Sequence, residues 1–139
     1  MKSFEDLICY QRASLIRRKV SELVKTFPKE EKYRLVDQMV RASRSAPAQI
    51  AEGYGRFHYQ ENIQFCRQGR GSLYELIDHL ITSEEEKYIS GEALVNFKSE
   101  IHECIAILNG YINYLIKLKE NPAKAEEPEL TYDLQTKIR

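Results

Sequence analysis

The sequence predicts an all-α protein, an antiparallel up-down-up-down four-helix bundle formed by residues 1–119. Four segments carry apolar residues at spacings of three and four, the period of a helix with one buried face. The 139 residues include only 6 Gly and 4 Pro, which argues against a turn-rich β-protein. This length suits a single domain with a sizeable core.

The first helix is predicted over residues 4–27. Ser3 can cap it, with Asp6 three residues further on, and Pro28 ends it. Ile8, Leu15 and Tyr10 widen its apolar stripe, and a stripe this wide suggests contact with more than one neighbour. The stripe itself consists of Cys9, Ala13, Ile16, Val20, Leu23, Val24 and Phe27.

The second helix is predicted over residues 29–54. Pro47 lies inside it, where a missing hydrogen bond and a steric clash predict a kink or a short break. Gly53-Tyr54-Gly55 is a natural stop. Its inner face consists of Leu35, Val36, Met39, Val40, Ala42 and Ala46.

The third helix is predicted over residues 59–88 and the fourth over 92–119, with Ser90 as cap of the fourth. Gly69 and Gly71 lie inside the third helix, which suggests that another helix approaches closely there. The fourth helix has a continuous heptad seam. Residues 120–139 are acidic and lack an apolar period, so we expect a mobile or loosely docked tail.

Charge and hydropathy limit the classes of protein. Lys and Arg total 21, as do Asp and Glu, so the formal net charge is zero. No apolar run approaches the length of a membrane span, and the first residues do not resemble a signal peptide, so we expect a cytoplasmic protein without a membrane partner. Residues 1–72 nevertheless carry a net charge of +6 and residues 73–139 a net charge of −6. The halves can attract one another, or the basic half can bind a polyanion.

The sequence lacks the usual constellations of catalysis. Cys9, Cys66 and Cys104 are widely spaced and are expected to be reduced, buried thiols. Gly53-x-Gly55 is followed by His58, where a dinucleotide loop needs a third Gly. Glu75 and His79 are four residues apart and are expected to pair on an exposed helix face. We therefore expect no catalytic residues, no metal, no cofactor and no small-molecule substrate, and hence no enzyme.

Four arginines are the candidate nucleic-acid-binding residues: Arg34, Arg41, Arg44 and Arg56. The first three share the outer face of the second predicted helix, although Asp37 lies among them. Arg56 follows the glycine turn beside aromatic residues, a combination that suits single-stranded nucleic acid. Solvated helix faces have a similar composition, so both interpretations stay open.

The run from Arg41 to Arg56 is distinctive and resembles the signature of the four-helix-bundle proteins encoded in intervening sequences of bacterial 23S ribosomal RNA genes. The blocks 4–13, 27–33 and 71–76 match as well, and the resemblance covers about residues 4–118. The chain departs from the family pattern at Tyr10, Gln49, Gly69 and Ile77, where the family often has Trp, Asn, Ala and Glu. The matching signature residues are Pro47, Ile50, Ala51, Glu52, Gly53, Gly55 and Arg56.

This resemblance implies a bundle that assembles as a homopentamer, with no established catalytic activity. A related protein is the accessory factor of diversity-generating retroelements; it is strongly basic and binds nucleic acid. Two hypotheses follow for this chain: an oligomeric scaffold or interaction module, and an RNA- or DNA-binding accessory factor. The first predicts that basic residues of the first half form ion pairs with the acidic half. The second predicts that they converge on one surface.

Overall fold

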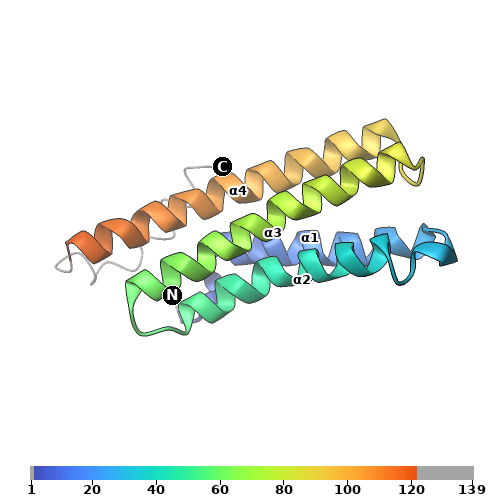
Figure 1. The fold of residues 1–139 in the computed structure, drawn as a ribbon. Helices are drawn as coiled ribbons and strands as arrows, with labels where there is room; N and C mark the ends of the chain where they lie inside the picture. Colours follow the sequence, from blue (N-terminus) through green and yellow to red (C-terminus); the bar gives the residue numbers. More distant parts are fainter. Residues whose placement is uncertain (1, 122–139) are drawn as a thin grey trace.

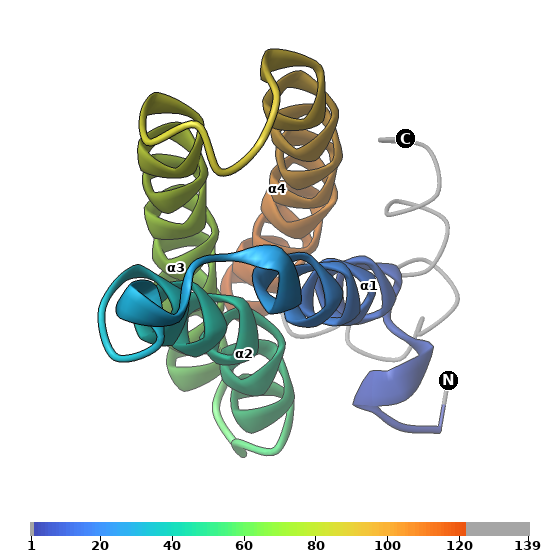
Figure 2. The ribbon, with the colours of Figure 1, turned by 90° about the vertical axis from the view of Figure 1, so that its right-hand side faces the viewer.

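The computed structural model describes residues 2–121 and confirms the all-α four-helix bundle. The long helices are α1 (Ile8–Leu23), α2 (Leu35–Tyr54), α3 (Tyr59–Glu85) and α4 (Gly91–Glu120). Each packs against the next in the chain, and α1 also packs against α4. In Figures 1 and 2 the α1–α2 pair and the α3–α4 pair diverge toward the end that holds the α1–α2 and α3–α4 connections. Apart from Glu120 and Asn121, the predicted tail lies outside the described residues.

The predicted first helix, 4–27, divides into three pieces. Ser3 forms the predicted capping box with Asp6, but the capped element is the short 3-10 turn η1 (Phe4–Asp6). Leu7 then adopts an extended conformation, with φ −69° and ψ 128°, and α1 starts after it. A second 3-10 turn, η2 (Val24–Thr26), follows α1 before Phe27 and Pro28. Hydrophobic periodicity continues through both turns, so it could not show these boundaries.

The second helix starts later than predicted. The chain from Lys29 first forms the 3-10 turn η3 (Lys29–Glu31), and Arg34 leaves the helical region with φ −120° and ψ −106° before α2 begins. Of the two alternatives predicted at Pro47, the short break does not occur, because α2 is continuous through it, and the kink stays a prediction. The flanking residues Ala46 and Ile50 are fully buried and lie next to Gly69 of α3. We attribute the continuity to this packing, which offsets the cost of an internal proline.

Helix α3 is shorter at its C-terminal end than predicted. α3 ends at Glu85 rather than at residue 88, because Lys87 takes a left-handed conformation with φ 64°. The Tyr88 N–H then donates to the Ser83 carbonyl at 2.9 Å, which turns the chain back toward the bundle. α4 begins at Gly91, and the predicted cap is confirmed: the Ser90 hydroxyl accepts from the Ala93 N–H at 3.0 Å.

Replacing Ser90 with Ala should lower the free energy of unfolding by about 1 kcal/mol, because the Ala93 N–H loses its capping partner. Chemical denaturation followed by circular dichroism measures this change. Ser99, an exposed serine inside α4, gives the matched control, and Ser99→Ala should be neutral or slightly stabilising. Equal stability of Ser90→Ala and the parent protein would show that the cap contributes nothing.

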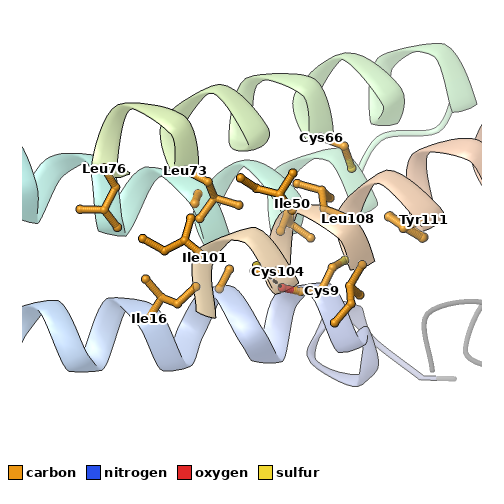
Figure 3. Close-up of a cluster of buried hydrophobic side chains, with 14 of the residues drawn as sticks. Cys9, Ile16, Ile50, Cys66, Leu73, Leu76, Ile101, Cys104, Leu108 and Tyr111 are labelled. Atoms are coloured by element: carbon orange, nitrogen blue, oxygen red, sulfur yellow. Dashed lines mark hydrogen bonds between the residues drawn. The ribbon is translucent and has the colours of Figure 1, made fainter. Parts of the chain in front are cut away.

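The core lies on the central axis, where all four helices contribute aliphatic side chains (Figure 3). Ile16, Ile50, Leu73 and Ile101 are examples from α1, α2, α3 and α4 in turn, each no more than 2% exposed. The three cysteines belong to the same cluster and are each 0% exposed, as predicted. Within residues 2–121, no helix is long and apolar enough to cross a lipid bilayer.

The two glycines inside α3 differ in their surroundings. A Cβ on Gly69 would lie 3.1 Å from the Ala46 carbonyl oxygen and 3.4 Å from the Gln49 Cβ, so the predicted close approach of another helix is confirmed there. At Gly71 the same prediction was wrong, because a Cβ would meet no atom within 4 Å. Gly71 faces solvent on the outer side of the helix.

Candidate interaction surfaces

Two of the four predicted arginines already have carboxylate partners. The Arg41 Nε lies 3.0 Å from the Asp37 carboxylate one turn earlier in α2. Arg56 contacts Glu52 at 3.1 Å and Glu61 at 3.6 Å. Its guanidinium also stacks over the ring of Phe65, 4.8 Å from the centroid. These contacts lower the positive charge that Arg41 and Arg56 offer to a ligand.

The other two predicted arginines lie in different places. Arg34 is exposed just before α2. Arg44 lies on the side of α2 that faces α1 and lines a pocket of about 240 Å³ between the two helices. The four arginines therefore differ in their surroundings, and Arg34 does not belong to the helix face on which it was predicted, because it precedes α2 with non-helical dihedral angles.

We call the pocket beside Arg44 the arginine groove; its lining residues are Arg17, Arg18, Ser21, Val40, Ser43 and Arg44. Arg17 and Arg18 both donate to the hydroxyl of Ser14, each at 3.0 Å. Arg17 and Arg18 were not among the candidates predicted from the sequence. The run Arg17-Arg18-Lys19 was a visible signal, but only the packing of α1 on α2 brings it next to Arg44.

A second surface follows the seam between α1 and α4. It comprises a pocket of about 450 Å³ and another of about 190 Å³. We call these two pockets together the α1–α4 groove. Its apolar side chains are Leu15, Ile16, Leu23 and Phe97, and its charged ones are Arg12, Arg18, Lys19, Glu22, Glu100 and Glu103.

Two ion pairs span the α1–α4 groove. Arg12 contacts Glu103, and the Lys19 Nζ lies 2.5 Å from the Glu100 carboxylate. Both join the basic first half of the chain to its acidic second half, so part of the charge asymmetry is neutralised inside the fold. Arg41 and Arg56 instead pair with acids of the first half. Arg12 and Lys19 thus pair as the first hypothesis predicts, whereas the pairs of Arg41 and Arg56 fit neither hypothesis.

The buried thiols do not provide a reactive nucleophile. Burial raises the pKa of Cys66 and that of Cys104 to about 12. Burial, with smaller contributions from the neighbouring Cys66 and Cys104, raises the pKa of Cys9 well above its ordinary value. Thiols with such pKa values stay protonated at neutral pH and are inert.

Several polar groups of the core are paired, although in the described part of the chain the buried Gln49 Oε1 has no hydrogen-bond partner. The Asn62 amide donates to the Tyr111 hydroxyl at 3.2 Å, and the Cys66 thiol lies 3.5 Å from the Asn62 Oδ1. Glu75 and His79 form the predicted pair at 2.9 Å, although His79 is buried rather than exposed. In the part of the chain that the structure describes, no three His, Cys, Asp or Glu side chains come together as metal ligands would.

The signature segment forms the corner between α2 and α3. Pro47, Ile50 and Gly53 are buried. A Cβ on Gly53 would lie 2.7 Å from the Asn62 Oδ1 and 2.9 Å from the Phe65 Cβ, so this glycine allows α2 and α3 to approach closely. Glu52 and Arg56 pair on the outer side of the corner. These contacts give the segment a structural role at the helix crossing.

The fold and this corner define a class of protein, the small antiparallel helical bundle with a Pro- and Gly-containing second helix. A family model described as 23S rRNA-intervening sequence protein matches residues 5–110. The chain belongs to this family, as the resemblance indicated. A search of curated proteins finds no match for the chain.

Proposed function

We propose that the chain is a non-catalytic, self-assembling interaction module, and that the α1–α4 groove is the surface on which a second copy docks. The observation that carries this proposal is the partly open apolar floor of the groove. Leu15 is 38% exposed there, and Leu23 and Phe97 are half-buried. A second chain packed on this floor removes that apolar surface from water.

The charges around the groove favour a second copy as the occupant. Arg12, Arg18 and Lys19 lie on the α1 side together with Glu22, whereas Glu100 and Glu103 lie on the α4 side. A mostly basic row beside an acidic row is complementary to another copy of itself in a suitable orientation, in which Arg12 and Lys19 exchange their present partners Glu103 and Glu100 for those of the second copy. The pentameric number comes from the family resemblance and not from the groove.

The alternative function, RNA or DNA binding by Arg34, Arg41, Arg44 and Arg56 as one set, has weaker support. Arg41 and Arg56 are held by carboxylates, and a polyanion must compete with Asp37, Glu52 and Glu61 for them. The arginine groove offers a different and more compact arrangement of positive charge, considered below.

Light scattering coupled to size-exclusion chromatography tests the proposed assembly. A pentamer of this 16.3 kDa chain has a mass of about 80 kDa. The variant Leu15→Glu with Phe97→Glu should shift the particle toward a single chain, because it places two carboxylates in the docking floor. Thermal unfolding by circular dichroism verifies that the variant remains folded.

Tyr74→Glu with Tyr33→Glu is the matched control, since both tyrosines are exposed and lie outside the groove. This control variant should form a particle of the same mass as the parent protein. A 16 kDa particle for the parent protein at micromolar concentration would refute self-assembly. An unchanged mass for the folded groove variant would show that the copies meet elsewhere.

A further inference from the structure

The arginine groove holds positive charge in an unusual arrangement. Arg17 and Arg18 are adjacent in α1 and both donate to one acceptor, the Ser14 hydroxyl. Ser14 is only 7% exposed, and a neutral hydroxyl does not neutralise two guanidinium groups. Arg44 adds a third cation from α2. Like charges this close repel one another, and bound counter-charge relieves that repulsion.

Within residues 2–121, no carboxylate lines this pocket. The acids on the neighbouring turns of the same helices are engaged elsewhere. Glu22 of α1 pairs with Lys25 at 2.9 Å, and Asp37 of α2 pairs with Arg41 at 3.0 Å. By contrast, Arg12 and Arg56 each have a carboxylate partner. The positive charge of the arginine groove is therefore available to an external anion.

The donors in the groove match a tetrahedral oxyanion. Guanidinium groups donate several hydrogen bonds in a planar fork that fits phosphate oxygens. Ser21 adds an exposed hydroxyl from α1, whereas the buried Ser43 hydroxyl of α2 already donates to the Val40 carbonyl at 2.9 Å. A pocket of about 240 Å³ admits one or two phosphate groups but is too small to enclose a nucleotide base together with its sugar and phosphates.

We propose that the arginine groove is a binding site for phosphate groups, with Arg17, Arg18 and Arg44 as the principal donors. The phosphates come from a small diphosphate-bearing molecule or from the backbone of a single-stranded oligonucleotide. Both present the same chemistry to the groove, and base identity makes no difference to it. This site lies between α1 and α2. Arg18 also lines the α1–α4 groove, whereas Arg17 and Arg44 do not, so substitutions at Arg17 and Arg44 test the phosphate site without altering the proposed docking surface.

Two probes separate the two sources of phosphate. Inorganic pyrophosphate is titrated by calorimetry, and a fluorescent twelve-residue oligouridine is titrated by anisotropy, both at low salt. The variant Arg17→Gln with Arg44→Gln removes one guanidinium from each helix. We expect it to weaken binding by about tenfold or more, because each lost charge-assisted hydrogen bond is strong. Circular dichroism and the particle mass should stay as in the parent protein.

The matched control is Lys29→Gln with Arg67→Gln, which removes the same charge from exposed positions outside the pocket. It should change binding by less than about twofold if the groove is the site. Binding of pyrophosphate without binding of the oligonucleotide identifies a small phosphorylated ligand. Binding of the oligonucleotide, with loss in the groove variant, identifies a nucleic-acid backbone.

Two results overturn the proposal. One is equal weakening by both double variants, which would mean that only the overall charge attracts the anion. The other is no binding of either probe to the parent protein at low salt. Because the particle mass is measured on the same samples, failure of this site and failure of self-assembly are distinguishable.

Discussion

Raising the pH from 8 to 10 should lower the free energy of unfolding by about 6 kcal/mol through the three buried thiols alone. In the unfolded chain a cysteine ionises near pH 8.5, to within about half a unit. In the folded chain, burial raises the pKa of Cys66 and of Cys104 to about 12 and raises that of Cys9 well above its ordinary value. The folded state thus retains protons that the unfolded state loses.

The sign follows from this difference in bound protons. Because the folded pKa values are raised, the contribution to stability is fully present below the unfolded pKa. It is lost as the pH rises toward the folded value, by about 1.4 kcal/mol per pH unit for each thiol. Burial also raises the pKa of Tyr111, which adds a loss of the same sign at still higher pH.

Cysteine variants isolate this effect from other ionisations. Urea denaturation under reducing conditions, at fixed protein concentration, gives the free energy of unfolding at each pH. Removing one thiol, as in Cys66→Ala, should reduce the pH slope above pH 9 by about 1.4 kcal/mol per unit. The slope is independent of any cavity that the substitution leaves. Identical slopes for the parent protein and for a variant lacking all three cysteines would contradict this account.

The apolar stripes and caps predicted most of the fold because they record local physics. Ser3 and Ser90 provide hydroxyls where the first amides of an element need acceptors, and both form the expected bonds. The heptad seam of α4 faces the core at Ile101, Cys104 and Leu108. Helix boundaries were less predictable, because the backbone leaves the helical conformation at Leu7 and Arg34 inside segments whose hydrophobic pattern continues unbroken.

The properties that depend on the packing of two helices could not be predicted from the sequence. The continuity of α2 through Pro47 rests on its packing against α3 near Gly69. The arginine groove rests on the register of α1 against α2, which brings Arg17 and Arg18 beside Arg44. The prediction considered only the outer face of the second helix, so it named Arg34 and Arg41 as binding residues and not Arg17 and Arg18. Periodicity gives the face of a helix, but not the residue that lies opposite.

A second large loss of stability is expected from a substitution at the α2–α3 corner. Gly53→Ala should lower the free energy of unfolding by about 2 kcal/mol, because the added methyl group has no room. Its Cβ would lie 2.7 Å from the Asn62 Oδ1, 2.9 Å from the Phe65 Cβ and 3.0 Å from the Asn62 carbonyl oxygen. The last of these atoms belongs to the backbone of α3, so the two helices must separate. A gain in helix propensity of about 1 kcal/mol offsets only part of this strain.

Separation of α2 from α3 has a further consequence for Asn62. Its amide donates to the buried Tyr111 hydroxyl of α4, so displacement of Asn62 also weakens the contact between α3 and α4. We therefore expect the Gly53→Ala variant to lose stability throughout the bundle rather than by fraying of one helix end. Hydrogen exchange of amides in α4 should accelerate along with those in α2.

Gly71→Ala is the matched control for this prediction. A Cβ at Gly71 meets nothing within 4 Å, so only the propensity gain remains, and this variant should be more stable by about 1 kcal/mol. Denaturation of both variants at equal protein concentration compares a glycine required by packing with one that is not. If Gly53→Ala is as stable as Gly71→Ala, the corner accommodates a methyl group, and the glycine of the signature segment has another role than helix packing.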